Sequence, residues 1–277
     1  MNTIIMDNIV LLAIVWQEGR RMGVVISIFI EAGGAGKTNT TLHTAWELAM
    51  RGKKVLMIDL DGQSGNLTFF TGIADSDDRL TMYDVLQKKK DIHSAILPVR
   101  ENLDLVPANF DVIDISPMRA GIDRMQEVIG LIRDEYDYIF IDNNPDPTYR
   151  HALTLSTADN VVVLMTGDYK SLESGHAVLE SVSEMRKVNP SIRIAGFLFN
   201  RFDQRLSIAR QVYATAEQMA ANNHSRIFHT IIRQDIMFTE SSAVHKGITE
   251  CAPKTRGSED IRSFADELEE VCSEQKK

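Results

Sequence analysis

The sequence predicts an α/β protein with a doubly wound, mostly parallel sheet and helices on both faces. Short apolar runs, typical of buried strands, alternate along the chain with longer segments in which apolar residues recur at helical spacing. Polar residues directly follow several of the apolar runs, as they do where parallel strands end at the ligand-binding edge of a sheet. Repeated β-α-β units place the connecting helices on both faces, so these observations indicate one parallel sheet.

The same patterns assign the individual elements. Strands are expected at 24–30, 55–58, 103–107, 136–142, 161–165, 192–199 and 227–232. Helices are expected over about 42–51, 122–132, 172–188, 207–221 and 258–272. The polar stretch 72–100 is expected to be mainly helical and is given no function.

Composition favours one large domain over residues 22–277. The chain has 277 residues and 44% hydrophobic content, which suffices for a sizeable core. A net charge of −9 argues against a protein whose whole surface attracts nucleic acid. The two cysteines, Cys251 and Cys272, show no metal-ligand spacing, which is typical of a protein of the reducing cytosol.

Residues 1–21 are interpreted as an N-terminal extension that the fold does not need. Their apolar run, 9–16, is too short to span a bilayer and lacks the basic residues of a secretion signal in front of it. A peripheral amphipathic anchor remains an alternative, because Arg20 and Arg21 follow the run.

The most informative stretch is 31–38, which reads Glu-Ala-Gly-Gly-Ala-Gly-Lys-Thr after the first predicted strand. Glycines let a loop curl with its N–H groups inward, lysine neutralises phosphates, and a threonine hydroxyl can bind Mg²⁺. The strict phosphate-loop pattern has glycine where Glu31 stands, so this is a variant of it. The alternative is a glycine-rich turn without a ligand. The predicted nucleotide-binding residues here are Gly33, Gly34, Ala35, Gly36, Lys37, Thr38 and Asn39.

Carboxylates follow two of the predicted strands. Asp59 and Asp61 stand at positions i and i+2, which point the same way in an extended segment. Asp142 closes the strand 136–142, where a phosphate-loop protein needs a carboxylate to organise Mg²⁺ through water. A solvated turn is the alternative for the first pair.

These motifs resemble those of the ParA/MinD group of deviant Walker A ATPases, and most closely the ParA-type partition proteins. Members carry K-G-G-x-G-K-T, D-x-D-P-Q and Y-D-Y-I-x-I-D, which are matched here by 32–38, 59–63 and 136–142. The resemblance runs from about residue 24 to about residue 250. It implies a P-loop NTPase fold with ATP and Mg²⁺ as ligands.

The resemblance also implies a function in DNA partition. Such a protein forms a homodimer around ATP, binds DNA without sequence preference, and hydrolyses ATP to ADP and phosphate when a ParB-type partner stimulates it. It would be cytoplasmic, associated with the nucleoid and without stable membrane association. Carried over by motif, Lys37 and Asp61 are catalytic and Asn200 contacts the base. The implied metal residues are Thr38, Asp59 and Asp142.

Three positions depart from the family pattern. The signature lysine, which reaches the partner's nucleotide across the dimer, is Ala32; the proline after the second aspartate is Gly62; and a threonine is Asn39. A charge contributed in trans to phosphoryl transfer can be worth orders of magnitude in rate. We therefore expect weak hydrolysis with nucleotide binding retained, unless another basic residue substitutes.

A basic region supports DNA binding. Residues 193–256 contain nine Lys and Arg residues against five acidic ones, although the whole chain is acidic. Such a face could meet DNA phosphates, with ordinary surface arginines as the alternative. The candidate residues are Arg201, Arg205, Arg210, Arg233 and Lys246.

Two other functions stay open at this point. Asn200-Arg201-Phe202-Asp203 resembles the N-K-x-D pattern by which GTPases recognise guanine, so a GTP-binding switch is one alternative. A nucleotide-gated scaffold or adaptor that has lost hydrolysis together with the lysine at position 32 is the other. The acidic C-terminal helix argues against a MinD-like membrane role.

Overall fold

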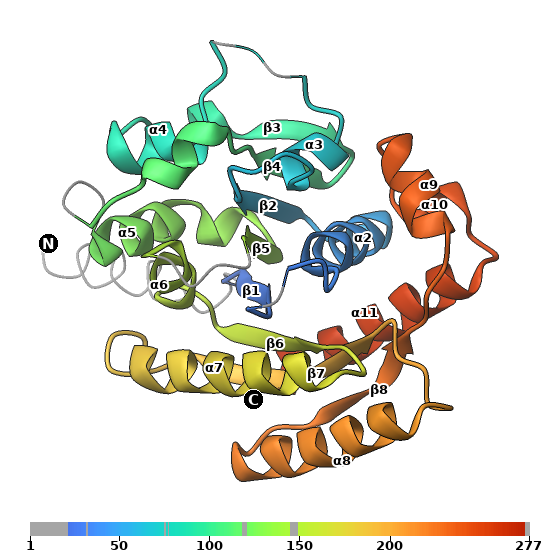
Figure 1. The fold of residues 1–277 in the computed structure, drawn as a ribbon. Coiled ribbons are helices and arrows are strands. Elements are labelled where there is room, and N and C mark those ends of the chain that lie inside the picture. The colour runs from blue at the N-terminus through green and yellow to red at the C-terminus, as the bar shows by residue number, and fades with distance from the viewer. Residues whose placement is uncertain are drawn as a thin grey trace, which may run out of the picture.

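The computed structural model describes residues 22–31, 33–74, 76, 78–117, 121–144 and 149–274, which form an α/β structure around one eight-stranded sheet (Figure 1). The predicted extension 1–21 and Ala32 lie outside the described residues. The strands are β1 (Val24–Phe29), β2 (Val55–Leu60), β3 (Leu97–Arg100), β4 (Leu103–Val106), β5 (Tyr138–Asn143), β6 (Asn160–Met165), β7 (Arg193–Asn200) and β8 (Ile227–Ile232).

The strands alternate with helices, as the periodicity predicts. The α-helices are α2 (Lys37–Met50), α3 (Leu67–Phe70), α4 (Met82–Gln87), α5 (Ile122–Ile132), α6 (Tyr149–Leu155), α7 (Tyr169–Met185), α8 (Ser207–Asn222), α9 (Met237–Ala243), α10 (Ile248–Cys251) and α11 (Arg256–Glu274). Three 3₁₀ turns complete the described elements: η1 (Ile92–Ala95), η2 (Phe110–Asp114) and η3 (Arg133–Glu135).

The predicted doubly wound, mostly parallel sheet is confirmed. The strand order is β3-β4-β2-β5-β1-β6-β7-β8, and every neighbouring pair is parallel except β3 with β4. Strand β1 lies between β5 and β6, so the chain winds outward from it in both directions. Ligands of such sheets bind at the carboxyl ends of the strands where the winding direction changes. The loop after β1 occupies that position.

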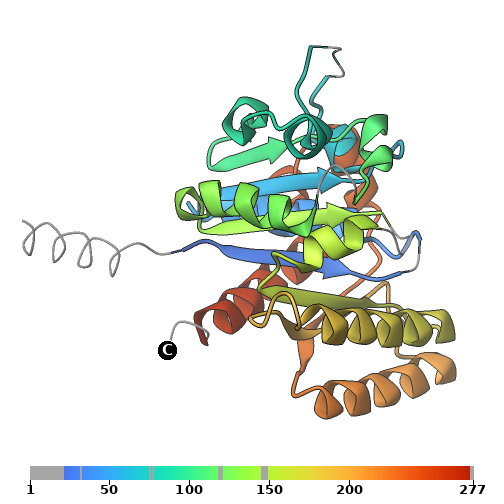
Figure 2. The ribbon, with the colours of Figure 1, turned by 90° about the vertical axis from the view of Figure 1, so that its left-hand side faces the viewer.

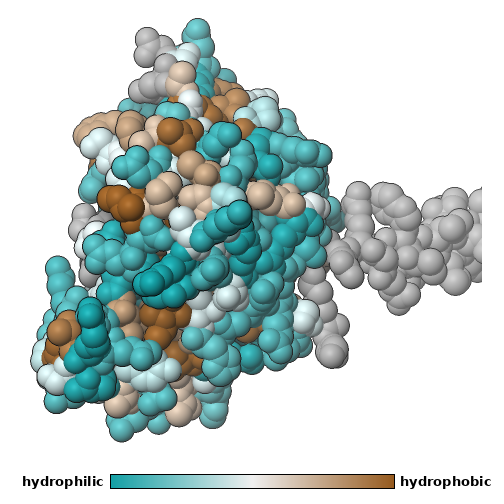
Figure 3. Space-filling model, turned by 90° about the vertical axis from the view of Figure 1, so that its right-hand side faces the viewer, coloured by the Kyte–Doolittle hydropathy of each residue, from teal (hydrophilic) through white to brown (hydrophobic). Residues whose placement is uncertain are grey.

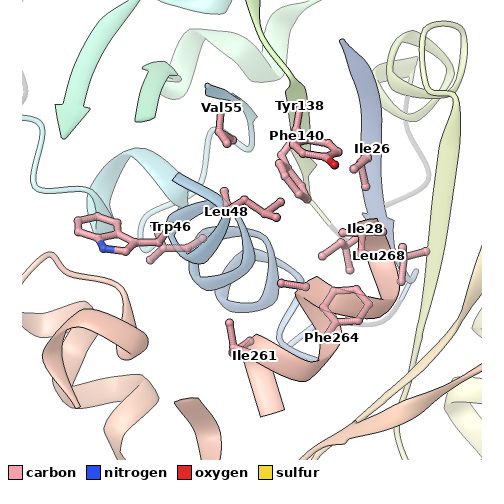
Figure 4. Close-up of a cluster of buried hydrophobic side chains, with 14 of the residues drawn as sticks. Ile26, Ile28, Trp46, Leu48, Val55, Tyr138, Phe140, Ile261, Phe264 and Leu268 are labelled. Atoms are coloured by element: carbon pink, nitrogen blue, oxygen red, sulfur yellow. The ribbon is translucent and has the colours of Figure 1, made fainter. Parts of the chain in front are cut away.

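Helices cover both faces of the sheet (Figures 1 and 2). Helices α2 and α11 pack on one face, where Leu48 and Phe264 point into the same cluster as Ile28 and Phe140 of the sheet (Figure 4). Helices α4 and α5 bury residues of the opposite face near β2 and β5, and α7 and α8 do so near β6 and β7. The continuous apolar strands follow from this cover, because both of their faces are buried.

Hydrogen bonds join helix α11 to α2, the helix that follows the phosphate loop. The guanidinium of Arg51, which caps α2, donates to Asp266 and Glu269 and to the backbone carbonyl of Arg262. The face that carries α9, α10 and α11 is largely hydrophilic, with hydrophobic residues in small separate groups (Figure 3). Within the part of the chain that the structure describes, no helix has the length and apolar character needed to cross a bilayer.

One predicted segment is wrong in part. The described residues of the stretch 72–100 form the short helix α4 and the turn η1 before the chain enters β3, which pairs antiparallel with β4 at the sheet edge. Polar composition alone favoured helix there, whereas β3 forms because Leu103–Val106 offers an unpaired strand edge. An edge strand with two exposed or half-exposed faces carries little hydrophobic periodicity.

Because of the buried His43 in α2, the stability of the fold is expected to decrease in acid. Its ring is fully buried, its Nδ1 accepts a hydrogen bond from the Ile248 N–H (3.1 Å), and burial lowers its pKa to about 3. Below pH 6.5 the unfolded chain binds a proton here that the folded protein excludes, so the free energy of unfolding falls as pH falls. From pH 7 to pH 5.5 this group costs about 1.2 kcal/mol.

The measurement is urea unfolding of the parent and of His43→Asn at both pH values. Asparagine keeps an acceptor for the Ile248 N–H but does not titrate, so the parent should lose about 1.2 kcal/mol more than the variant. Equal losses would show that His43 takes up a proton in the folded protein.

Candidate nucleotide-binding site

The loop between β1 and α2 has the geometry of a phosphate loop. Gly34 and Gly36 have positive φ angles of 74° and 98°, which ordinary side chains rarely adopt. A Cβ atom at Gly36 would also collide with the amide of Asn200. The helix α2 then begins at Lys37, whose side chain is 7% exposed. Glycine is therefore required at these positions, and the loop leads into a helix N-terminus, where anions bind.

Thr38 and Asp142 meet beneath this loop. Strands β1 and β5 are neighbours, and the Thr38 Oγ1 donates a hydrogen bond of 2.7 Å to Oδ2 of Asp142. The carboxyl of Asp142 is fully buried, and its Oδ1 has no hydrogen-bond partner. Burial raises the pKa of Asp142 to about 7, although the Thr38 hydrogen bond and the charge of Lys37 oppose the rise.

This pair fits a nucleotide-dependent Mg²⁺ site. A hydroxyl and one carboxylate are typical protein donors for Mg²⁺ in a phosphate-loop site, where phosphates and water supply the other ligands. No group of three or more His, Cys, Asp or Glu side chains suited to a metal occurs among the described residues, so a metal cage made by the protein alone is absent there.

Asp59 has a different environment from the one that its motif suggests. It lies opposite Asp142 in the β2–β5 register, fully buried, and it accepts hydrogen bonds from Thr68 Oγ1 (2.6 Å), the Thr68 N–H (2.8 Å) and the Asp61 N–H (2.9 Å). Burial and the neighbouring Asp142 raise the pKa of Asp59 to about 8. The carboxyl thus anchors the segment that carries Asp61.

Asp61 itself faces the phosphate loop. It is half-buried and lines a cavity of about 310 Å³ together with Gly33, Lys37, Thr38 and other loop residues. Its Oδ1 accepts the N–H of Gln63 at 3.0 Å, which orders the turn after β2. Of the two carboxylates in the predicted pair, Asp61 is therefore the one placed to contact a bound phosphate or an attacking water.

A second cavity continues from the first. It measures about 270 Å³, shares Gly36, Asn39 and Arg201 with the phosphate cavity, and is otherwise lined mainly by the segment after β8. Asn200 also lines it, and its Nδ2 donates to the Ala35 carbonyl at 2.6 Å. The position beside the helix N-terminus suits a base and ribose. The predicted nucleotide residues other than Ala35 thus line one continuous space.

Sequence reasoning missed two parts of this site. Asn143 lines the phosphate cavity, yet the sequence showed it only as the polar residue that ends a strand. The segment from Arg233 to Thr239 lines the base cavity, and its only signal was its place directly after β8. Ligand-contacting loops carry no hydrophobic period, so position at a strand end is the one clue available.

The proposed DNA-binding residues do not form one free basic face. Arg233 binds Asp260 and Glu259, and Lys246 pairs with Glu250. Arg205 is 89% exposed but pairs with Asp203. Arg210 donates to the carbonyls of Gln204 and Arg205, and the Arg201 guanidinium donates to the Gly34 carbonyl. Carboxylates of the protein therefore neutralise the charge of Arg205, Arg233 and Lys246. The DNA contacts of all five residues stay predictions.

Comparison with known proteins agrees with this geometry. The AAA domain family matches residues 23–194. The chromosome-partitioning ATPase Soj of Thermus thermophilus is 31% identical over 246 residues, which is 88% of this chain and 94% of Soj. The chain belongs to the ParA-type partition ATPases. The sporulation initiation inhibitor protein Soj of Bacillus subtilis, 30% identical, covers 89% of this chain, and 98% of that protein is matched.

Solved structures of this group share the fold. The apo form of McdA from Cyanothece aligns with a TM-score of 0.80 at 21% identity, over 91% of this chain and all of the other. MinD of Pyrococcus horikoshii, complexed with Mg-ADP, aligns with a TM-score of 0.73 at 22% identity, over 91% and 98% of the two chains. The predicted P-loop NTPase fold is thereby confirmed.

Proposed function

We propose that this ParA-type chain is a Mg²⁺-dependent ATPase of DNA partition. The observation that carries the proposal is the Thr38–Asp142 hydrogen bond beneath the Lys37 loop, next to a cavity lined by Asp61. Lys37 would neutralise the outer phosphates, and Asp61 would orient the attacking water. Bound Mg²⁺, held by Thr38 and Asp142, would offset the negative charge of the phosphates.

The ATP-bound form is proposed to be a homodimer that binds DNA without sequence preference and responds to a ParB-type protein. The support is the chain's similarity to a chromosome-partitioning ATPase over nearly its whole length. Arg205 and Arg210, both exposed, are the proposed DNA contacts. Such a protein would be cytoplasmic and associated with the nucleoid, without stable membrane association.

Adenine is favoured over guanine as the base. A GTP-binding switch would use Asp203 to recognise guanine, but Asp203 does not line the base cavity. It lines a third cavity, on the part of the phosphate loop that carries Gly33, Gly34 and Ala35, and its carboxyl is held by Arg205, which keeps the pKa of Asp203 at about 2. Two residues of the N-R-F-D segment, Asn200 and Arg201, line the base cavity and also donate hydrogen bonds to the phosphate loop.

A non-hydrolysing scaffold is the second candidate, and one observation favours it. Position 32 carries alanine where the family has its signature lysine. Such a protein would still bind Mg-ATP, dimerise and bind DNA, but its turnover would stay near zero with DNA and partner present.

The nucleotide preference tests the proposal directly. Isothermal titration should show Mg-ATP binding at least about tenfold tighter than Mg-GTP, since a site without a guanine-reading carboxylate gains nothing from guanine. Asp203→Asn serves as the matched variant and should leave the ratio unchanged. Tighter GTP binding that Asp203→Asn abolishes would favour the GTP-binding switch.

The same preparation tests the link to DNA. Retention on duplex DNA of arbitrary sequence should require ATP and should fall steeply with salt, because phosphate contacts release counterions. Retention that is the same without nucleotide, or none in any nucleotide state, would contradict the partition role while leaving the ATPase assignment intact.

A further inference from the structure

We infer that Arg201 is a second phosphate-binding cation of the nucleotide site, acting in the same subunit as Lys37. This inference rests on the proposed function, because it presumes that a nucleoside triphosphate binds at the phosphate loop. It also reassigns a residue that the sequence placed on a DNA-binding face.

The backbone holds Arg201 at the loop. Arg201 directly follows β7 with a φ of 53°, in the left-handed region that few non-glycine residues occupy. Its N–H donates to the carbonyl of Ile232 at 2.7 Å, which joins the ends of β7 and β8. This fixed turn directs the side chain back over the loop, where its Nη1 donates to the Gly34 carbonyl at 3.0 Å.

The Arg201 guanidinium lies where a bound nucleotide would extend from its phosphates to its base. Arg201 lines the phosphate cavity and the base cavity, and also the third cavity. The cations that line the phosphate cavity, within the described ranges, are Lys37 and Arg201. A guanidinium has five donors, so one bond to the Gly34 carbonyl leaves donors for phosphate oxygens.

The charge of Arg201 is also uncompensated by the described residues. Arg205, Arg233 and Lys246 each pair with a carboxylate, but Arg201 has no ion pair with any described residue. An unpaired cation beside an anion-binding loop favours the ligand with the most negative charge. A triphosphate keeps more negative charge than a diphosphate with Mg²⁺ bound, so Arg201 should contribute more to ATP than to ADP binding.

The experiment measures how the contribution of Arg201 to nucleotide binding depends on the number of phosphates. Mg-ADP and the non-hydrolysable Mg-adenylyl imidodiphosphate are titrated calorimetrically into the full chain and into Arg201→Asn, Arg201→Lys and Arg186→Asn. Asparagine tolerates a positive φ, so the turn after β7 should survive the change. Arg186→Asn removes an exposed arginine at the end of α7 that lines none of the cavities at the loop, and it is the matched control.

We expect Arg201→Asn to weaken binding of the triphosphate analogue about tenfold and binding of ADP clearly less, with Arg201→Lys in between and Arg186→Asn unchanged. An equal loss for both nucleotides would mean that Arg201 only shapes the loop, and no loss would mean no contact; either result overturns the inference. If Arg201→Asn loses retention on DNA but binds both nucleotides like the parent, the inference is overturned as well. Failure of the parent to bind either nucleotide would instead refute the proposed function.

Discussion

Replacing Lys37 by alanine is expected to weaken binding of Mg-ATP by roughly 100-fold or more. The ammonium group begins α2 inside the phosphate loop and is 7% exposed, so little solvent screens it from a bound phosphate. Its loss leaves the outer phosphates without their principal cation. Calorimetric titration of Mg-ATP into parent and variant measures the effect.

Two controls make the result specific. Lys187→Ala removes an exposed lysine that lies outside the cavities at the loop, so its affinity should equal that of the parent. Thermal unfolding of the empty proteins shows whether Lys37→Ala still folds. A folded Lys37→Ala protein with unchanged affinity would mean that nucleotide does not bind at this loop.

Replacing Ala32 by lysine is expected to raise ATP turnover by at least about tenfold at saturating ATP. The reason is the family pattern, in which a lysine at this position brings a positive charge to the partner's transferring phosphoryl group. Steady-state phosphate release, with DNA of arbitrary sequence present, measures the change. Nucleotide affinity should move less than turnover, because the added charge acts on the developing transition state.

Ala32→Gln separates charge from side-chain length and should leave turnover near that of the parent. Adding Asp61→Asn to Ala32→Lys should remove the gain, because the added lysine still needs an oriented water. A rate unaffected by Ala32→Lys would show either that another residue already supplies this charge or that hydrolysis does not belong to this protein.

Sequence patterns predicted the sheet because its strands are buried on both faces. Runs such as Val161–Met165 are continuously apolar, short and rich in valine, which favours a buried strand over a buried helix. The edge strand β3 escaped prediction for the opposite reason, since one of its four residues is exposed and the others are half-buried. Its strand structure depends on the neighbouring β4, which no local pattern reveals.

The candidate site was predictable only where chain order alone brings residues together. Thr38 and Asp142 end up in contact because adjacent parallel strands deliver them to the same edge. The roles of Asp59 and Arg201 were not accessible, because they depend on hydrogen bonds to Thr68 and to the Gly34 carbonyl across the fold. Motif spacing identifies which residues gather at a site but not the direction in which each one points.

The contact between Thr38 and Asp142 bears on how this protein would acquire magnesium in the cell. Thr38 donates its hydroxyl proton to Asp142 and keeps an oxygen lone pair for the ion, so these two described residues offer Mg²⁺ one hydroxyl oxygen and one carboxylate that can hold the ion's water. Mg²⁺ needs six ligands and sheds its water reluctantly. The free protein should therefore be a poor chelator that acquires its ion together with the nucleotide, and its occupancy should follow the supply of ATP rather than that of the metal.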